Sequence, residues 1–328
     1  MITPPGVSVV LPVYNGQKYL RKSIDSVLQQ SFANFEFIIW NDQSSDDSAE
    51  IIASYSDRRV KKFVNAHNRG LFPTLNLAIA EVQAPLIRLW SQDDIMKPDC
   101  LEKELTFIHR YETAGMSYCL YDVIDEKGNL IRPAPDHLTP DLVSPALAAQ
   151  IMFYHGSITG NIANVMLRKS TIEAVGNFRE DMQIAGDFEM WVRISEKFPI
   201  AFFRKPMIYL RSHDGQFSRQ ARSYIICMGE EHSIYATLLE RQPASELEYA
   251  RKYDRRHRYL QYVHFMIRHF LMGHFKIAFA SYKAIRQIDN PLALIALWIL
   301  TADQRLFRMM SKYELAYGKP EFQPDRGH

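Results

Sequence analysis

VSVVLPVYNGQKYLRKSIDSVLQQSF, the stretch Val7–Phe32, joins a β-branched apolar run to a helical repeat through a short polar turn. The apolar run stops at Pro12 and Asn15, which disfavour a longer strand. Beyond the turn, apolar residues recur at the three- and four-residue spacing of an amphipathic helix: Tyr19, Leu20, Ile24, Val27 and Leu28. This stretch therefore predicts a buried strand followed directly by a helix.

The same alternation continues downstream. Strand-like segments lie at 35–42, 60–65 and 85–94, and helical segments lie at 44–56 and 71–82. Strands that alternate with helices predict βαβ units and a mostly parallel, Rossmann-like, doubly wound α/β sheet. Ligands of such sheets bind beyond the carboxyl ends of the strands. The polar segments at those ends are therefore binding candidates, although each alone is also what a solvated turn looks like: 12–16, 41–47, 65–70 and 91–94.

The pattern changes after the fourth strand. Residues 118–133 resemble a hairpin with its turn at 127–129, and residues 161–178 a strand with a short helix that ends near Gly176. A helix from Gly186 and a strand over 200–213 follow, and helical patterns continue from about Ser223. We therefore expect an α/β domain over residues 1–220 and an α-helical C-terminal extension over residues 221–328.

Composition indicates an ordinary globular protein, with 328 residues, 47% hydrophobic residues and a formal net charge of +2. The cysteines Cys100, Cys119 and Cys227 are three in number and widely spaced, which favours a reducing compartment over disulfides or a zinc site. The first residues resemble a strand opening more than a signal peptide. The longest apolar run, Leu292–Leu300, is about half of the ~20 residues that a spanning helix needs. We expect a cytoplasmic protein that does not cross a membrane.

The order of these motifs resembles the family 2 glycosyltransferases over about Val7–Arg219. The segments that carry the resemblance are VSVVLPVYNGQKYLRKSIDSVLQQSF, WNDQSSDDS, NRGLFPTLNLAIA, LWSQDDIMKP, GNIANVMLRKSTIEAVGNFRED and GDFEMWVRIS. The resemblance implies a GT-A fold for the first domain. It also implies transfer of a sugar, with inversion, from a nucleotide-diphosphate sugar to an acceptor hydroxyl, assisted by Mg²⁺ or Mn²⁺.

The resemblance places the metal-binding motif at Ser91-Gln92-Asp93-Asp94. Asp93 matches the acid that binds the ion, because it lies five residues before Pro98, as in relatives with a proline there. Many members have Asp-x-Asp-Asp, so Ser91 replaces the first carboxylate. The resemblance implies a second metal contact from His213, for which a solvated loop histidine is the alternative. Asp94 has an alternative role as the cap of a helix that starts near Pro98.

The resemblance also supplies a catalytic base and a donor site. Asp187 matches the acid that deprotonates the acceptor, with Gly186 where a glutamate is usual, and helix capping is its alternative role. Asp42 corresponds to the acid that binds the nucleotide base, and Arg69 is placed for the base or a phosphate. Asp46 and Asp47 fit better as helix caps. The predicted donor-binding set is Pro12, Tyr14, Asn15, Asp42, Arg69, Gln92 and Asp93.

The C-terminal region carries an uneven charge. Arg251–Arg286 contains nine Lys or Arg residues and one acid, Asp254, mixed with aromatic and aliphatic residues at helical spacing. One interpretation is a surface that rests on an anionic membrane at its inner face. The alternative is a helical subdomain packed on the core or on a second subunit of a homo-oligomer. No nucleic-acid-binding module is visible.

These observations favour an inverting glycosyltransferase that uses a UDP-sugar, or alternatively a dTDP- or GDP-sugar. By analogy with the family, its acceptor is a glycan or lipid-linked oligosaccharide in bacterial surface polysaccharide synthesis, such as O-antigen or capsule. Two other classes stay open. A nucleotidyltransferase should have a glycine-rich basic loop after the first strand, whereas residues 12–20 contain one glycine and one lysine. A non-catalytic nucleotide-sugar-binding protein would fit the missing first acid.

Overall fold

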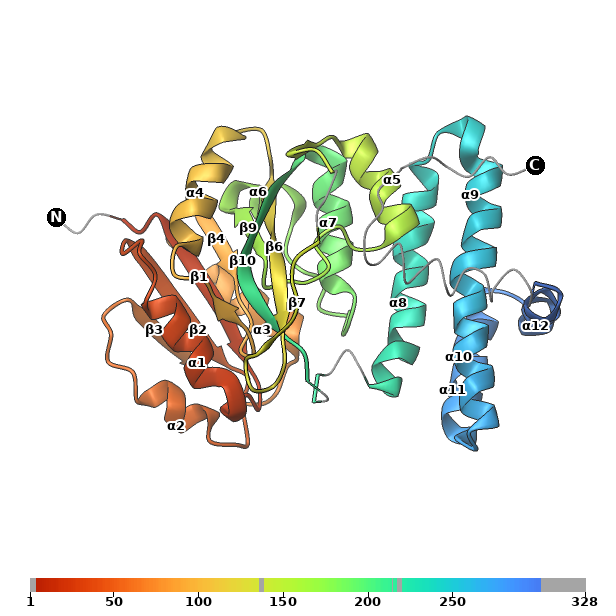
Figure 1. Ribbon diagram of the computed structural model, residues 1–328, viewed down its shortest axis with the longest axis horizontal. Helices are drawn as coiled ribbons and strands as arrows, with labels where there is room; N and C mark the ends of the chain where they lie inside the picture. The colour runs from red at the N-terminus through yellow and green to blue at the C-terminus, as the bar shows by residue number, and fades with distance from the viewer. Residues whose placement is uncertain (1–3, 136–138, 214, 217–219, 302–328) are drawn as a thin grey trace. The chain divides into compact units, whose positions relative to one another are not determined.

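The computed structural model describes residues 4–135, 139–213, 215–216 and 220–301. The chain divides into two compact units, one formed by residues 1–134 and 140–218 and the other by residues 135–139 and 219–328. The first unit is an α/β structure and the second is helical (Figure 1). Each unit has its own apolar core and is described separately below.

The α/β unit is organised by one ten-stranded sheet. Its main path runs β3-β2-β1-β4-β9-β6-β10-β5, with β7 beside β6 and β8 beside β10. The strands are β1 Val7–Val13, β2 Phe35–Asn41, β3 Val60–Val64, β4 Leu86–Leu89, β5 Ile95–Met96, β6 Met116–Ile124, β7 Leu130–Arg132, β8 Leu142–Val143, β9 Val165–Arg168 and β10 Ile200–Arg211.

Most of the long strands run in one direction. β3, β2, β1 and β4 are parallel neighbours, and β10 pairs in parallel with β6. β9 lies antiparallel between β4 and β6, so β6 and β10 keep the direction of β1. The expected mostly parallel sheet is thus confirmed, with the short strands β5, β7, β8 and β9 running against it. The fourth strand ends at Leu89, so residues 91–94 leave the sheet earlier than its apolar pattern predicts.

Helices cover both faces of this sheet. The helices of the unit are α1 Gln17–Leu28, α2 Ser48–Ala53, α3 Leu71–Ala80, α4 Cys100–Arg110, α5 Pro145–His155, α6 Lys169–Val175 and α7 Gly186–Lys197. Alternate strand residues such as Val9 and Phe37 pack in one cluster with side chains of α1 and α4, represented by Ile24 and Leu101. The intervening residue Val10 is equally buried, on the side where α3 packs on β1 and β2. This arrangement is the predicted doubly wound one.

The helical unit is built by α8 Ala221–Glu240, α9 Leu247–Asp254, α10 Leu260–Leu271, α11 Phe275–Ile288 and α12 Pro291–Leu300. A short 3-10 turn, Ala244–Glu246, precedes α9, and a π-helical turn, Arg255–Tyr259, joins α9 to α10. Its core consists of Met228, Tyr262, Val263, Met266, Ala278, Ile285 and Leu294. The expected helical C-terminal region is confirmed over residues 221–301, and residues 302–328 of that prediction lie outside the described residues. Within the described residues, no helix has the length and apolar character needed to cross a membrane.

Candidate functional site

The predicted binding segments meet at one edge of the sheet. β1, β2 and β4 are parallel neighbours, so their carboxyl ends share an edge. β10 ends at the same edge, and its residue Tyr209 pairs with Ile95 at the start of β5. Because Asp93 and Asp94 directly precede Ile95, they lie beside the end of β10, close to Arg211 and His213. We call this edge the sheet rim.

The turns after β1 and β2 are held together by side-chain to backbone hydrogen bonds. The Asn15 backbone N–H donates to Ser44 Oγ at 3.0 Å, and Asn15 Oδ1 accepts from the Ser45 N–H at 2.8 Å. Asn15 has a φ of 49°, a backbone conformation that asparagine tolerates better than most residues. Pro12 pairs in register with Trp40 one residue before each strand ends. The predicted wall of the donor site is therefore a braced turn, and the Tyr14 side chain is 48% exposed on it.

Asp46 and Asp47 occupy the start of α2. Asp46 Oδ1 accepts from the Ser48 N–H, and its other oxygen accepts from the Gln17 N–H, each at 3.0 Å. Burial acts to raise the pKa of the Asp46 carboxyl, but hydrogen bonds from the Ser48 side chain and from these two N–H groups outweigh it and lower that pKa. Asp47 is the N-cap residue, although its side chain makes no capping hydrogen bond. The helix-start role expected for this pair is thus carried by Asp46.

Gln92 links the end of β4 to the end of β1. Its Oε1 accepts from the Tyr14 N–H at 2.9 Å, and its Nε2 donates to the Tyr14 carbonyl at 3.0 Å. We call these two hydrogen bonds the Gln92 clip. A Cβ on Gly16 would lie 2.5 Å from Gln92 Oε1, so glycine at this position leaves the room that the clip needs. Both polar atoms of Gln92 are therefore engaged with the backbone, which gives a structural reason for an amide within the acidic motif.

Asp42 is more deeply placed than its predicted role suggests. Its side chain is buried, and its carboxylate accepts from Asn65 Nδ2 at 2.7 Å and from the Arg69 and Gly70 N–H groups at 2.8 Å each. Gly70 has a φ of 93°, which glycine adopts without strain. The carboxylate thereby shapes the 65–70 loop and presents the exposed Arg69 side chain.

Asp93 and His213 face each other at the rim. Asp93 Oδ2 lies 3.4 Å from His213 Nε2, and the two side chains are 22% and 11% exposed. Within the part of the chain that the structure describes, this buried Nε2 has no hydrogen-bond partner. Burial raises the pKa of the Asp93 carboxyl, against the opposing effects of His213 and Arg211. The two predicted metal contacts are thus brought together.

Asp94 has a different role from its neighbour. It is buried, and its Oδ1 accepts from the Arg211 backbone N–H at 2.8 Å. Burial, with a smaller contribution from the adjacent Asp93 charge, raises the pKa of Asp94 to about 7. The next helix begins at Cys100 with Asp99 at its N-cap. The alternative in which Asp94 caps that helix is therefore wrong, because its carboxylate fixes the end of β10 instead.

Arg211 is a rim residue that sequence reasoning missed. Its side chain donates to the carbonyls of Asp93 at 3.0 Å, Asp125 at 2.9 Å and Glu126 at 3.1 Å. The guanidinium lies 4.6 Å from the centre of the Tyr19 ring. Its second terminal nitrogen is buried and has no hydrogen-bond partner among the residues described. The available signal was an arginine at the end of an otherwise apolar strand, two residues before His213.

Asp187 lies in the first turn of α7. Its Oδ1 accepts a hydrogen bond from the Phe188 N–H at 2.7 Å. Asp187 thus makes a contact at the helix start, and this contact is compatible with the predicted catalytic role. A Cβ on Gly186 would lie 2.7 to 2.8 Å from the Phe72 ring. Since real Cβ atoms do not approach so closely, packing against α3 accounts for glycine at the position where the family has glutamate.

The rim residues fit a divalent ion as a partial ligand set. A carboxylate oxygen and an imidazole nitrogen are both ligands for Mn²⁺, and carboxylates suit Mg²⁺. Their separation of 3.4 Å allows one ion to contact both atoms. No group of three or more His, Cys, Asp and Glu side chains suited to a metal occurs in the described ranges. Asp93 and His213 would therefore hold an ion only together with oxygens from a bound ligand.

The fold and the rim define a class: an α/β protein of GT-A type with an acidic, histidine-containing edge at the ends of its parallel strands. Residues 8–169 match the family model described as Glycosyl transferase family 2. An uncharacterized glycosyltransferase of Rickettsia felis is 29% identical over 226 residues, which are 67% of this chain and 36% of that protein. The chain thus spans about a third of that relative's length. In sequence match, in this relative and in fold, the chain is similar to family 2 glycosyltransferases.

Solved structures show the same fold at low sequence identity. Staphylococcus aureus TarS 1-349 in complex with UDP-GlcNAc has a TM-score of 0.57 and 19% identity, over 80% of this chain and 72% of that one. The mannosyltransferase PcManGT of Pyrobaculum calidifontis, in complex with GDP-Man and Mn²⁺, has a TM-score of 0.56 and 14% identity, over 95% and 83% of the two chains. These likenesses confirm the GT-A fold.

Proposed function

We propose that this chain is an inverting glycosyltransferase that moves a sugar from a nucleotide-diphosphate sugar to a hydroxyl of a glycan or lipid-linked acceptor. By analogy with the family, the product belongs to a bacterial surface polysaccharide made on the cytoplasmic side of the membrane. The observation that carries the proposal is the Asp93 and His213 pair, with an unsatisfied imidazole nitrogen among the described residues, beside the buried Arg211.

The rim offers complementary groups for a nucleotide diphosphate. Tyr14 presents an exposed aromatic side chain beside the carboxyl end of β1, and Arg69 is exposed on the loop that Asp42 shapes. A base can stack on an aromatic ring, and a guanidinium can bind a phosphate through two hydrogen bonds. Asp42 would then act on the base chiefly through the loop, because three donors already engage its carboxylate.

The reaction requires stabilisation of the negative charge that the departing diphosphate carries. Asp93 and His213 would hold Mg²⁺ or Mn²⁺, which offsets negative charge on the diphosphate oxygens when it is bound. Arg211 adds a fixed positive charge in a buried position, where its effect is less screened by water than at the surface. Asp94 keeps the end of β10 in place and so fixes where His213 and Arg211 lie.

The acceptor hydroxyl must lose its proton during the transfer, which requires a general base. Asp187, in the first turn of α7, would take the proton of the acceptor hydroxyl as that oxygen attacks the anomeric carbon, and the bond to the diphosphate breaks on the opposite face. Because Gly186 carries no carboxylate, a single acid serves here. Inversion follows from one displacement with one base.

The nucleotide base of the donor differs among proteins with this fold. TarS is described with UDP-GlcNAc and PcManGT with GDP-Man, so two different bases occur on this fold. We propose a UDP-sugar as the donor and keep dTDP- and GDP-sugars as alternatives. A reducing compartment is also part of the proposal. Within the described ranges no disulfide joins Cys100, Cys119 or Cys227, and the thiol is the form that such a compartment maintains.

Calorimetric titration with UDP, GDP and dTDP, with Mn²⁺ or with EDTA, tests the donor site. We expect one nucleotide to bind in Mn²⁺ at least tenfold more tightly than in EDTA, and His213→Ala to remove that metal dependence. His109→Ala, an exposed histidine in the last turn of α4, is the matched control. Equal binding by wild type in Mn²⁺ and EDTA would remove the metal from the proposal, and no binding of any nucleotide would refute it.

The non-catalytic alternative rests on Ser91, where a first acid is missing. It predicts that nucleotide sugars bind and that no sugar is released or transferred. Release of radiolabelled sugar from the best-binding nucleotide sugar, lost in Asp187→Asn while binding persists, would exclude that alternative.

A further inference from the structure

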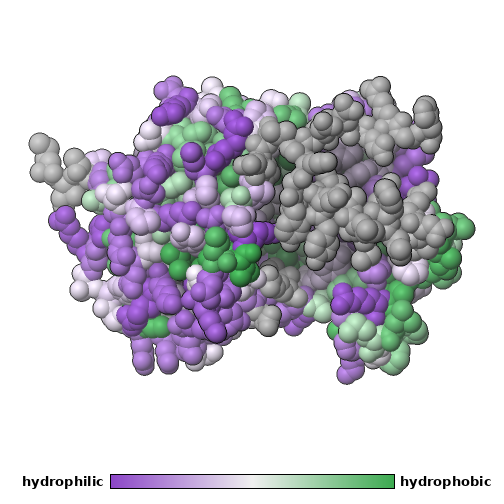
Figure 2. All heavy atoms as spheres, in the orientation of Figure 1, coloured by the Kyte–Doolittle hydropathy of each residue, from purple (hydrophilic) through white to green (hydrophobic). Residues whose placement is uncertain are grey.

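The helical unit exposes a compact apolar surface in addition to its buried core. Where α10 ends and α11 begins, five large apolar side chains are more than half exposed: Phe270 58%, Leu271 78%, Met272 54%, Phe275 62% and Phe279 60%. We call this surface the α10–α11 tip. Figure 2 shows hydrophobic and hydrophilic side chains side by side at this end of the unit. Soluble proteins rarely leave so many neighbouring apolar side chains in water without a partner.

The tip has a defined conformation. Gly273 makes the turn with a φ of 77°, and a Cβ there would meet nothing within 4 Å. The Phe270 and Phe275 rings meet edge to face, with centroids 5.4 Å apart across the turn. His269 Nδ1 lies 3.1 Å from His274 Nδ1. The exposed apolar side chains are therefore presented by a structured turn.

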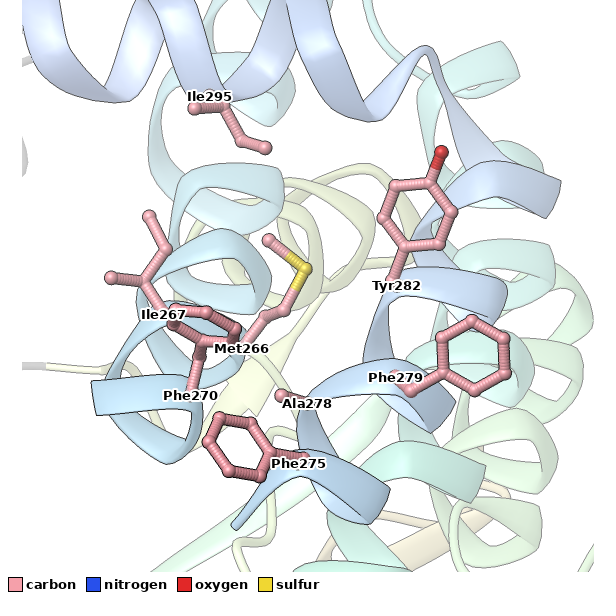
Figure 3. Close-up of a pocket in the computed structure, with 8 residues that line it drawn as sticks. All are labelled: Met266, Ile267, Phe270, Phe275, Ala278, Phe279, Tyr282 and Ile295. Atoms are coloured by element: carbon pink, nitrogen blue, oxygen red, sulfur yellow. The ribbon is translucent and has the colours of Figure 1, made fainter. Parts of the chain in front are cut away.

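Behind the tip lies an apolar pocket of about 460 Å³. Figure 3 shows its lining side chains, which come from α10, α11 and α12: Met266, Ile267, Phe270, Phe275, Ala278, Phe279, Tyr282 and Ile295. The Tyr282 hydroxyl is the one polar side-chain group in this set. Such a pocket suits hydrocarbon chains and offers almost nothing to a polar ligand.

The charge of the α10–α11 hairpin itself is of one sign. Between Asp254 and Asp289 the sequence contains seven Lys or Arg residues and no acid. Arg255 and Arg258 form ion pairs with Asp289 and Asp254 at the far end of the hairpin. Four others are exposed along α10 and α11: Arg268, Lys276, Lys283 and Arg286. Lys283 Nζ lies 4.7 Å from the Phe279 ring centre, so cation and apolar surface are adjacent.

We propose that the α10–α11 tip docks on an anionic lipid bilayer. Its apolar side chains would enter the boundary between headgroups and acyl chains, and the flanking cations would contact anionic headgroups. A second copy of this chain is the less favourable partner, because it would bring one acid-free basic surface against another. The inference concerns the helical unit alone and does not depend on the proposed function.

Flotation of the full chain with vesicles tests the proposal. We expect the protein to float with vesicles that mix phosphatidylcholine and phosphatidylglycerol, to bind phosphatidylcholine alone much more weakly, and to lose binding as salt screens the charges. The variant Phe270→Ser/Leu271→Ser/Phe275→Ser should float at least tenfold less. Leu130→Ser/Ile131→Ser, two residues each 57% exposed on β7, is the matched control and should float like wild type.

The charges are tested in the same assay. Lys276→Glu/Lys283→Glu should reduce flotation with anionic vesicles, whereas Lys22→Glu/Lys205→Glu, which changes exposed lysines of the α/β unit, should have little effect. Wild-type flotation that is equal on neutral and anionic vesicles, or unchanged by the tip substitutions, would overturn the proposal. So would the absence of flotation together with a dimer that the tip substitutions dissociate, which would assign the tip to a second copy.

A gain of signal provides an independent measurement. In Met272→Trp, the indole should be quenched by lipids with brominated acyl chains in anionic vesicles, beyond the quenching of wild type. Leu130→Trp, on the exposed β7 strand, should show no such extra quenching. Quenching of both variants to the same extent would contradict docking through the tip.

Discussion

The sheet rim and the α10–α11 tip treat their characteristic side chains in opposite ways. At the rim, polar side chains are held by hydrogen bonds: three donors fix the buried Asp42, the Arg211 backbone holds the buried Asp94, and the half-buried Gln92 bonds the Tyr14 backbone. At the tip, apolar side chains stand in water on a tight turn. A site that must stabilise charge needs groups that are already oriented, whereas a surface that awaits a partner needs only exposure. Replacing a few atoms of a rim side chain should therefore change stability or activity, whereas replacing a whole side chain of the tip should leave stability nearly unchanged.

The largest expected effect is on turnover. Asp187→Asn keeps the shape of the side chain and removes the proposed base, so turnover should fall by about 10² to 10⁴-fold while donor binding changes little. Steady-state kinetics and calorimetry measure the two quantities. Glu196→Gln, an exposed acid on the same helix, is the control. Normal turnover in Asp187→Asn would end the assignment of this residue as the base.

Removal of the buried rim cation should have the next largest effect. Arg211→Met deletes hydrogen bonds to three backbone carbonyls, so the free energy of unfolding should fall by about 3 kcal/mol. Urea unfolding, followed by circular dichroism, provides the measurement. Arg69→Met, which changes an exposed rim arginine, should stay within about 0.5 kcal/mol of wild type. Equal stability of the two variants would show that burial does not hold the rim together.

Asp94 should make stability depend on pH. Its pKa is raised to about 7 in the folded protein, so between an unfolded value of about 3.9 and that value the folded state binds the proton more tightly. The contribution of Asp94 to stability should therefore fall as pH rises through this window and stay constant above it. In EDTA, Asp94→Asn should flatten that slope, which is at most ~1.4 kcal/mol per pH unit. An unchanged slope in unfolding experiments from about pH 5 to 8 would contradict the raised pKa.

A smaller effect is expected from the Gln92 clip. Gln92→Ala removes two hydrogen bonds to the Tyr14 backbone, so stability should fall by about 1 to 2 kcal/mol. Donor affinity should fall as well if Tyr14 forms part of the donor wall. Gln83→Ala, at an exposed glutamine before β4, provides the comparison for unfolding. A loss of donor affinity without any loss of stability would instead favour direct contact between Gln92 and the donor.

The smallest effect should come from the tip. Phe275→Ser replaces a side chain that is 62% exposed, so the free energy of unfolding should stay within about 0.5 kcal/mol of wild type in the absence of lipid. Thermal unfolding without vesicles measures this directly. A large loss would mean that the tip is part of the core, and the contrast with the rim would then fail.

Much of the fold could be predicted from the sequence, because apolar periodicity and turn residues are local signals. Two predictions rest on such signals: the alternation of strands and helices from β1 to β4, and the hairpin with its turn at 127–129. The structure has both, with Gly128 at a φ of 97°. The antiparallel β9 was harder to foresee. A buried strand looks the same in sequence whichever way it runs, so its direction depends on long-range pairing.

The rim was predictable as a location and less so in its details. The strand ends indicated that residues 41–47 and 91–94 would meet at one edge, and Asp93 and His213 lie 3.4 Å apart there. The sequence could not show that Asp42 and Asp94 would be buried with backbone donors, because the donors come from segments 27 and 117 residues away. Arg211 was missed for the same reason.

Gly186 limits the mutational routes open to this protein. The Phe72 ring is buried, stacks on Phe178, and occupies the space that any side chain at position 186 would enter. A paired acid beside Asp187 therefore requires two coordinated replacements, one to vacate the space and one to fill it. Replacing Phe72 alone would leave a cavity in the packing of α3, and replacing Gly186 alone would press a side chain against the ring, so each intermediate should be less stable than the present protein. The absence of a second acid directly before Asp187 is thus enforced by an aromatic ring on a different helix.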